Sequence, residues 1–477
     1  MNIAETYRKS ESKLRTIATL LMPFVMINVI LSEWSGIRAP YIISAFLIII
    51  YLSLSLNNLS LSRKLFLIVG LFLTFCSIFL LPDWFSVSIE ALTKSTFVAT
   101  FFLSLCCLRK AAASSPSMEK CGKYLAEQKS NLRYLTLSFG GHMFGVILSF
   151  GSISLLGSLA EKGSSDIKNL EMRAIKRKSM LLAVQRGFVA MTCWSPLTFS
   201  IAITTSVIPD TSWKGAAISC IISAFILILL GWALDYLSSQ KLKSKIELED
   251  FSSNGTWHTL IPLAFIFITL LGMIFILMDY TDLKAVPIVM LVVPIYSIAW
   301  VAYQNMGNTK KMFYSTKHRV DEFINDDIYN YKAELIVLIM AAFIGIMGSS
   351  LIYQLAGDSM SFLDALPASI ILISIIWIMP LCGQIGMNPI LAVYMIGPLI
   401  PSAAVMGISP NSIIVALTAG WAITGISSPF TASTLLIARL GKVTPHHAGL
   451  NWNGWFTIIG GLLLSVWIII ANEFIVT

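Results

Sequence analysis

The chain has 477 residues, of which 56% are hydrophobic and 12% are charged, and its formal net charge is +8. So little charge excludes a large water-soluble domain and indicates an all-α, polytopic membrane protein. The Lys and Arg residues gather in short segments between apolar runs, as in cytoplasmic loops, so the positive charge implies no nucleic-acid partner. The seven cysteines have no metal-ligand spacing, and we expect no metal and no cofactor beyond a coupling ion.

The first apolar runs are expected to be four membrane spans. Arg8, Lys9, Lys13 and Arg15 precede the first run and place the N-terminus in the cytoplasm. No cleavage site typical of a signal peptide follows that run, so we interpret it as a retained span. The four spans are expected at about 17–31, 41–56, 65–81 and 95–108.

The next apolar stretch, Tyr134–Leu159, has basic residues on both sides, so both of its ends are expected in the cytoplasm. Its 26 residues (159 − 134 + 1) are too few for two spans, which need about 40 residues. We therefore predict a re-entrant hairpin, with the helix broken at Gly140 and Gly141 and the turn lying between there and Ser152. A helix lying on the membrane surface is the alternative, but the stretch has no polar face.

Five further spans are expected at about 179–208, 216–234, 260–278, 285–302 and 335–355, with basic loops after the second and the fourth of them. From Ala365 to Ala438 the chain has no Asp, Glu, Lys, Arg or His. This stretch starts outside and ends inside, so it crosses an odd number of times. Either three spans or one span after an outward-opening hairpin would fit. We predict the hairpin, over 366–401, because three spans would need a cytoplasmic loop without charge. Its turn is expected at Gly383, Gly386 and Pro389.

The pattern Ser-Pro-x-Thr-x-Ser occurs at Ser195–Ser200 and again at Ser428–Ser433, once in each half of the chain. Pro196 and Pro429 each remove a backbone donor and clash with the preceding turn, so both helices are expected to break there. A break frees backbone groups that hydrocarbon cannot satisfy. One copy alone is typical of a packed proline kink, whereas a copy in each half indicates the binding site of a transporter.

With a last span at about 455–470, the expected layout has eleven spans and two hairpins. Loop charges orient the first broken helix outward and the second inward, which makes the two halves an inverted repeat. We expect a tail and first span over 1–38, a first repeat over 39–240 (hairpin 134–159, broken helix 179–208) and a second repeat over 241–477 (hairpin 366–401, broken helix 412–438).

This layout resembles the ion transporter superfamily, especially the divalent anion/sodium symporters. Those proteins have eleven spans, two oppositely opening hairpins, a cytoplasmic N-terminus and an external C-terminus. They also carry a Ser-Asn-Thr signature at both hairpin tips, which this chain lacks. Here the second tip has Gly386, Met387, Asn388 and Pro389 instead. The resemblance implies the fold, an elevator mechanism and a homodimer.

The resemblance also implies that oxygen atoms at the hairpin tips and helix breaks hold sodium, with an anionic solute at the half-helix N-termini. Any single Ser or Thr could instead bond to its own backbone. The candidate sodium ligands are Ser149 and Ser152 facing Thr198 and Ser200, and Gln384 and Asn388 facing Thr431 and Ser433. The candidate solute-binding residues are Ser195, Thr198, Asn388, Ser428 and Thr431.

Two titratable residues, His142 and Arg186, lie near the first break in the sequence. No carboxylate lies deep in an expected span, which favours sodium over protons as the coupling ion. His142 lies near the first hairpin tip and is the candidate for proton coupling, with a hydrogen-bonded neutral histidine as the alternative. Arg186 is expected near the cytoplasmic end of its span, reaching out to the membrane surface rather than binding solute.

The sequence thus predicts a secondary active transporter in the plasma (inner) membrane that moves a small, carboxylate-type anion with sodium. We do not expect an enzyme, although a membrane-embedded enzyme of glycan or lipid assembly and a proton-coupled carrier are the alternatives. In the expected elevator, the hairpins and broken helices move as a block against a scaffold formed by spans such as 65–108 and 260–355.

Overall fold

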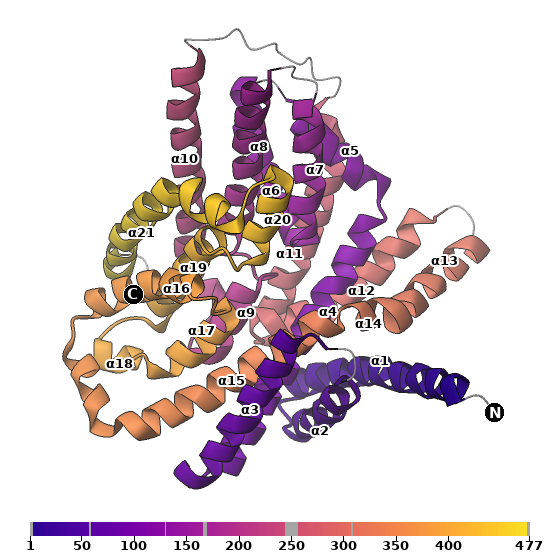
Figure 1. The fold of residues 1–477 in the computed structure, drawn as a ribbon, viewed down its shortest axis with the longest axis vertical. Coiled ribbons are helices and arrows are strands. Elements are labelled where there is room, and N and C mark those ends of the chain that lie inside the picture. Colours follow the sequence, from indigo (N-terminus) through magenta and orange to yellow (C-terminus); the bar gives the residue numbers. More distant parts are fainter. Residues whose placement is uncertain are drawn as a thin grey trace. The chain divides into compact units, whose positions relative to one another are not determined.

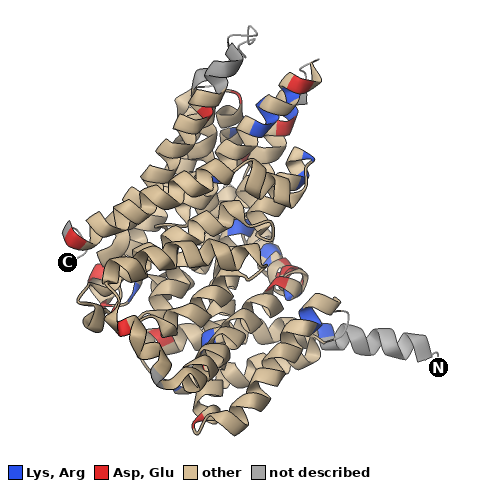
Figure 2. Ribbon diagram, turned by 60° about the vertical axis from the view of Figure 1, so that its left-hand side comes forward, with Lys and Arg blue, Asp and Glu red and all other residues tan. Residues whose placement is uncertain are grey.

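The computed structural model describes residues 3–56, 59–128, 130–165, 169–243, 256–306 and 309–474. All regular elements within these ranges are helices, as Figure 1 shows. The longest helices are almost free of Lys, Arg, Asp and Glu over most of their length (Figure 2). The expectation of an all-α, polytopic membrane protein is confirmed.

Nine helices in the described ranges are long and apolar enough to cross a membrane, or ten if one bent pair counts as a span. Each of the nine coincides with one of the eleven expected spans. The other two exist as the 16-residue α2 (Ala39–Leu54) and as a broken span, α8 (Leu170–Met191) with α9 (Phe199–Val207). The nine are α1 (Ile3–Ser35), α3 (Leu61–Leu80), α4 (Trp84–Ala113), α10 (Trp213–Lys243), α11 (Ile261–Thr281) after the short η1 (Trp257–Leu260), α12 (Ala285–Gln304), α15 (Lys332–Ala356), α19 (Pro410–Ser427) with α20 (Ala432–Gly441), and α21 (Gly454–Phe474).

The chain divides into two compact units. Unit 1 comprises Met1–Ala111, Ile276–Met360 and Tyr394–Leu399, and unit 2 comprises Ala112–Phe275, Ser361–Val393 and Ile400–Thr477. Unit 1 therefore contains the simple spans α1 to α4, α12 and α15, together with α13 (Thr309–Glu322), η2 (Phe323–Asp327) and α14 (Ile328–Asn330). Unit 2 contains both Ser-Pro-x-Thr-x-Ser segments and the helices around them.

Serine and tryptophan side chains cross-link the spans of unit 1. Ser95 of α4 donates to the carbonyl of Ile339 in α15 at 2.9 Å, and Ser104 of α4 donates to the carbonyl of Met290 in α12 at 3.1 Å. Trp34 of α1 donates to a carbonyl at the start of α12 at 3.2 Å. These bonds fix the register of four spans in a region where few other polar groups exist.

The first expected hairpin of unit 2 is a helix pair, α6 (Ser130–Leu148) and α7 (Gly151–Ser165), with the short α5 (Pro116–Ala126) packed against both. Its turn lies at Ser149, which has a φ of 50°. The prediction that Gly140 and Gly141 break the helix was wrong, because both lie inside α6. Their absent side chains serve packing instead: a Cβ at Gly141 would lie 2.3 Å from the carbonyl oxygen of Val184 in α8.

In the second expected hairpin, α16 (Ala368–Gln384) ends in a turn and α17 (Pro389–Ile396) follows, continued by η4 (Gly397–Leu399) and the short α18 (Ala403–Met406). Gly386 supplies the turn with a φ of 85°, and Pro389 starts α17 as expected. Gly383 lies in the last turn of α16 rather than in the break. The apolar helix Pro389–Leu399 has 11 residues (399 − 389 + 1), or about 16 Å, so it is too short to cross a bilayer core of about 30 Å.

Candidate functional site

The first Ser-Pro-x-Thr-x-Ser segment interrupts a helix in unit 2, since α8 ends at Met191 and α9 begins at Phe199. The hydroxyl of Ser195 accepts a hydrogen bond from the backbone N–H of Leu197 at 3.3 Å. The hydroxyl of Thr198 donates to the carbonyl of Ser195 at 2.7 Å. Ser200 lies 2.9 Å from the Thr198 hydroxyl and donates to the carbonyl of Thr192, eight residues earlier. Side chains thus satisfy the backbone groups that Pro196 leaves without helical partners.

The second segment repeats this arrangement between α19, which ends at Ser427, and α20, which begins at Ala432. The hydroxyl of Ser428 accepts from the N–H of Phe430 at 3.2 Å, and the hydroxyl of Thr431 donates to the carbonyl of Ser428 at 3.0 Å. Ser433 donates to the carbonyl of Gly425, again eight residues earlier, and also lies 3.3 Å from Thr431. Each of these bonds has its counterpart in the first segment, and both expected helix breaks are present.

Both breaks leave the following half-helix without a side-chain cap. Thr198 and Thr431 occupy the N-cap positions of α9 and α20 in the extended conformation that usually places a hydroxyl on the N–H groups of the first turn. Neither makes that cap bond. The side chains of Thr198 and Thr431 thus leave the positive end of each half-helix dipole uncapped, and an anion is stabilised at such an end.

Close backbone contacts join each broken helix to a helix that precedes it in the chain. A Cβ at Gly187 of α8 would lie 1.9 Å from the carbonyl oxygen of Ser138 in α6, and one at Gly420 of α19 would lie 3.0 Å from that of Ile376 in α16. Gly187 precedes the first motif by the same number of positions as Gly420 precedes the second. The helix pairs α6–α8 and α16–α19 thus repeat each other in register.

The second tip is bonded directly to the second break. Ser428 donates to the carbonyl of Gly383 at 2.7 Å, and Gln384 lies at 3.5 Å from the hydroxyl of Ser427. Asn388 uses its carbonyl oxygen to accept from the N–H of Ile390 at 2.9 Å, which caps the start of α17. Among the described residues, neither amide side chain bonds to Thr431 or Ser433, so the tip and the break adjoin without the expected shared contact.

The first tip makes its bonds within itself. Ser152 is fully buried and donates to the carbonyl of Ser149 at 2.8 Å. In the part of the chain that the structure describes, no hydrogen bond joins Ser149 or Ser152 to Thr198 or Ser200. All four residues lie in unit 2, but their oxygen atoms point into separate local networks.

His142 fastens the first hairpin to the first break. Its Nε2 accepts from the indole N–H of Trp194 at 2.9 Å, so its proton is on Nδ1, which lies 3.2 Å from the carbonyl of Gly187. Trp194 is held in turn by Trp213, whose indole N–H donates to its carbonyl at 2.6 Å. Both ring nitrogens of the buried His142 are therefore hydrogen-bonded in its neutral form. A proton on Nε2 would point at the indole N–H of Trp194, so that two donors would face each other.

Arg186 does not reach the membrane surface, and the expectation that it would was wrong. Its side chain is buried, with a residue exposure of 5%, and its guanidinium lies 4.7 Å from the centre of the Phe456 ring. It donates to Asn453 at 3.2 Å and lies 3.4 Å from the hydroxyl of Tyr134 and from the carbonyl of Gly231. The hydrogen-bond partners that the structure describes for this cation are all neutral, and the carboxylate of Asp235 in α10 also interacts with it electrostatically.

A chain of hydrogen bonds leads from Arg186 to the second break. Asn453 accepts from Arg186 and donates to the side-chain oxygen of Gln185 at 3.1 Å. Gln185 donates to the hydroxyl of Thr434 at 3.2 Å, which also accepts from Thr431 at 3.1 Å. Asn453 follows η5 (His447–Asn451), so the cluster joins three distant parts of the sequence. This cluster was not predicted, although Gln185 and Arg186 are a polar pair inside an apolar run, which is itself a sign of function.

Comparisons with known proteins identify the class of fold. No protein-family model matches the chain, and no curated protein sequence matches it. Among solved structures, the YdaH transporter of Alcanivorax borkumensis, described as having an unusual topology, is 16% identical with a TM-score of 0.58 over 87% of this chain and 99% of that chain. MtrF of Neisseria gonorrhoeae, described with a class of antimetabolite efflux pumps, is 15% identical with a TM-score of 0.59 over 87% of this chain and 96% of that chain.

The chain therefore has a fold found in membrane transporters. At these identities the likeness concerns the fold, and it extends over nearly the whole length of both neighbours. Both are described as transport proteins and neither as an enzyme. The finer layout of the divalent anion/sodium symporters stays a prediction.

Proposed function

We propose that the protein is a secondary active transporter that binds a small anionic, carboxylate-type solute between its two helix breaks. The observation that carries this proposal is the pair of identical, uncapped half-helix N-termini at Thr198 and Thr431, in a chain with a transporter fold. Uncapped N–H groups and the positive dipole end favour an anion. The buried cation Arg186, whose hydrogen-bond partners among the described residues are neutral, adds positive potential to the same unit, and the carboxylate of Asp235 offsets part of it.

Sodium is the proposed coupling ion. Hydroxyl and carbonyl oxygens gather at both breaks, and such ligands suit a hard monovalent cation. No Asp, Glu or His occurs in 365–438, which includes the second break, so this half has no proton-carrying side chain there. His142, the candidate for the proton-coupled alternative, uses both ring nitrogens in structural bonds. The proposed ligands remain Ser149, Ser152, Thr198, Ser200, Gln384, Asn388, Thr431 and Ser433.

An inverted repeat, an elevator movement and a homodimer complete the proposal. The repeated bonds of the two breaks and the matching contacts of Gly187 and Gly420 support a duplication, and the loop charges support its inversion. Both breaks lie in unit 2, whereas most of the expected scaffold, 65–108 and 276–355, lies in unit 1. Such a division is what a moving block and a fixed scaffold require. The charges of the N-terminal segment support a cytoplasmic N-terminus in the plasma (inner) membrane.

The proposal is tested with purified protein in liposomes, with currents recorded as mono- and dicarboxylates, including aromatic ones, are added with and without a sodium gradient. We expect at least one carboxylate to produce a sodium-dependent current. Thr431→Val keeps the shape but removes one oxygen, so it should raise the sodium concentration for half-maximal current about five-fold. Thr418→Val, in the same broken span but away from the break, is the matched control and should not.

Two results would contradict the proposal. Currents that ignore sodium, follow the proton gradient and disappear in His142→Ala would establish the proton-coupled alternative. Equal sodium shifts in Thr431→Val and Thr418→Val would show that the break does not hold the ion. Because MtrF is described with efflux pumps, each solute is supplied from both sides of the membrane, so that export is detected as readily as uptake.

A further inference from the structure

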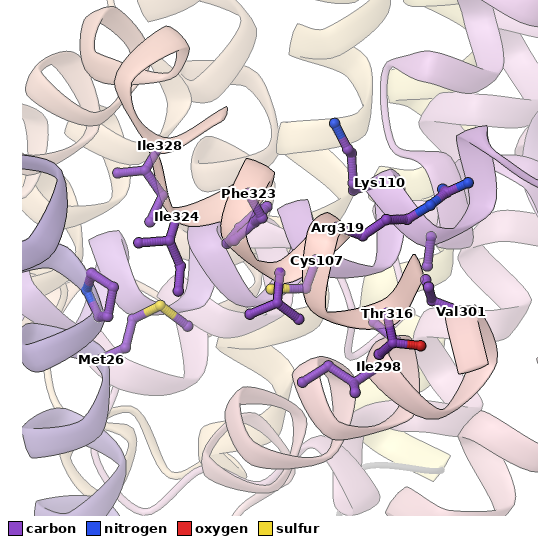
Figure 3. Close-up of a pocket in the computed structure, with 14 residues that line it drawn as sticks. Met26, Cys107, Lys110, Ile298, Val301, Thr316, Arg319, Phe323, Ile324 and Ile328 are labelled. Atoms are coloured by element: carbon purple, nitrogen blue, oxygen red, sulfur yellow. The ribbon is translucent and has the colours of Figure 1, made fainter. Parts of the chain in front are cut away.

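A cavity of about 150 Å³ opens in unit 1, which contains neither helix break. Its wall is formed by α1, α4, α12, α13, η2 and α14, and most of its lining side chains are apolar. Figure 3 shows Met26, Ile324 and Ile328 at one end and the two cations Lys110 and Arg319 close together at the other. An apolar hollow with its positive charge at one end matches a molecule with a hydrocarbon tail and an anionic head.

The two cations differ in how they are neutralised. Lys110 is ion-paired with Glu322 at 2.9 Å and with Asp327 at 2.8 Å. This contact with Lys110 lowers the pKa of Glu322, so the pair is fully charged at neutral pH. Arg319 lines the same cavity and forms no ion pair with any residue that the structure describes. Its charge acts on Glu322 only electrostatically, while Glu322 is in direct contact with Lys110. The guanidinium N–H groups of Arg319 are therefore the donors that an incoming anion can use.

The surroundings of Arg319 have the composition of a membrane interface. Phe313 and Tyr314 of α13 are 71% and 72% exposed, on a helix that also carries Lys310 and Lys317. Exposed aromatic rings combined with basic residues are typical of helices lying at the level of lipid headgroups. The cavity adjoins the ends of α4 and α12 that lead into basic segments, which the positive-inside rule places at the cytoplasmic face.

We propose that this cavity binds an anionic phospholipid of the cytoplasmic leaflet. The phosphate contacts Arg319 at the mouth, and part of one acyl chain lies against Met26, Ile298 and Val301. A cavity of this volume is of the size that accommodates a benzene-sized apolar group, so it holds several methylene groups and the rest of the chain stays in the bilayer. A zwitterionic lipid brings its own cation to the mouth and gains less from Arg319.

The test measures lipid binding by native mass spectrometry of the purified full chain, with dioleoylphosphatidylglycerol and dioleoylphosphatidylcholine added at equal concentrations. The phosphatidylglycerol should bind more tightly. Arg319→Gln should weaken its binding about five-fold and leave phosphatidylcholine unchanged. Lys317→Gln, two residues away on the same helix and outside the cavity lining, is the matched control and should have little effect. Val301→Phe fills the cavity and should weaken both lipids.

The possible outcomes distinguish a specific lipid site from nonspecific electrostatic binding of anionic lipid to the protein. Equal binding of the two lipids to the wild-type protein, or equal losses in Arg319→Gln and Lys317→Gln, would overturn the proposal. So would undiminished binding to Val301→Phe. Glycerol phosphate, which has the charge without the chains, should not compete at the same concentration, and competition would show a soluble-phosphate site instead. If Val301→Phe does not fold, Ile298→Phe, at a half-exposed position of the same wall, replaces it.

Discussion

The two helix breaks share their hydrogen bonds but differ in how far they are covered. At the first break, Leu197 and Thr198 are 3% and 5% exposed, and Trp194 is hydrogen-bonded to His142 beside the break. At the second, Thr431 is half-buried and Phe430 is 56% exposed. The same backbone arrangement thus exists once in a closed and once in a reachable form. The local sequence determines the break, while the neighbouring aromatic side chains determine access to it.

Glycine-to-alanine substitutions should give the largest difference in stability between the two breaks. Gly187→Ala places a Cβ against a backbone carbonyl and should destabilise the protein by about 3 kcal/mol or more. Gly420→Ala meets a wider gap and should cost about 1 kcal/mol. Gly272→Ala in α11, where a Cβ meets nothing within 4 Å, is the control and should be neutral or slightly stabilising. Thermal unfolding in detergent measures all three, and equal losses at 187 and 420 would remove the distinction.

The second-largest difference should be in how strongly side-chain hydrogen bonds hold each hairpin tip to its break. His142→Ala leaves the Trp194 N–H without its acceptor and removes a second hydrogen bond from the Gly187 carbonyl, which should cost about 2–3 kcal/mol. Gln384→Leu loses one long bond of 3.5 Å at a half-buried position and should cost less than about 1 kcal/mol. Unfolding midpoints give both values. A Gln384 variant as unstable as the His142 variant would mean that the second tip is closed as firmly as the first.

Removing one hydroxyl from each break should separate folding from transport. Thr198→Val leaves the carbonyl of Ser195 and the hydroxyl of Ser200 short of a buried partner, so it should lower stability by about 1–2 kcal/mol. Thr431→Val is less buried and should cost under about 1 kcal/mol while shifting the sodium requirement. Unfolding and sodium titration on the same preparations test this. A larger stability loss at 431 than at 198 would reverse the assignment of closed and reachable breaks.

Labelling should distinguish the tips with almost no effect on stability. In a chain whose seven native cysteines are replaced, Ile385→Cys places a thiol at a position that is 77% exposed, and Phe150→Cys places one at a position that is 38% exposed. A large impermeant maleimide should reach position 385 from outside only and position 150 from the cytoplasm only. Labelling of position 385 from the cytoplasm alone would contradict the second hairpin and favour three full spans.

Hydropathy and the repeated motif were sufficient to predict most of the helices. Hydropathy located the spans because hydrocarbon demands long apolar helices, and Pro196 and Pro429 located both breaks. The prediction of a helix break at Gly140 and Gly141 failed because glycine in a membrane helix allows close helix contact as readily as it allows a turn. The actual turn is at Ser149, inside the predicted range between Gly140 and Ser152, but serine has no strong preference for positive φ, so the sequence did not single out this residue.

The candidate site was predictable only where it is local. The hydrogen bonds of each break join residues within eight positions of one another, so the repeated motif contains nearly all of that information. The cluster of Arg186, Gln185 and Asn453 joins residues 267 and 268 positions apart. A single sequence does not record such pairing, and the expectation for Arg186 failed because helix length alone could not reveal what covers it.

The glycine contacts have a consequence for the speed of the proposed cycle. At Gly187 the helices α8 and α6 are in close backbone contact, and at Gly420 the helices α19 and α16 are. Sliding by one full helical turn would bring Met191 into a space too small for a Cβ, or Thr424 into a space that fits little more than a Cβ. The helices of the proposed moving block therefore cannot slide past one another. The energy barrier of each turnover is then set by moving the whole block through the surrounding lipid. Turnover should therefore vary with the acyl-chain length of the bilayer, while solute affinity stays constant.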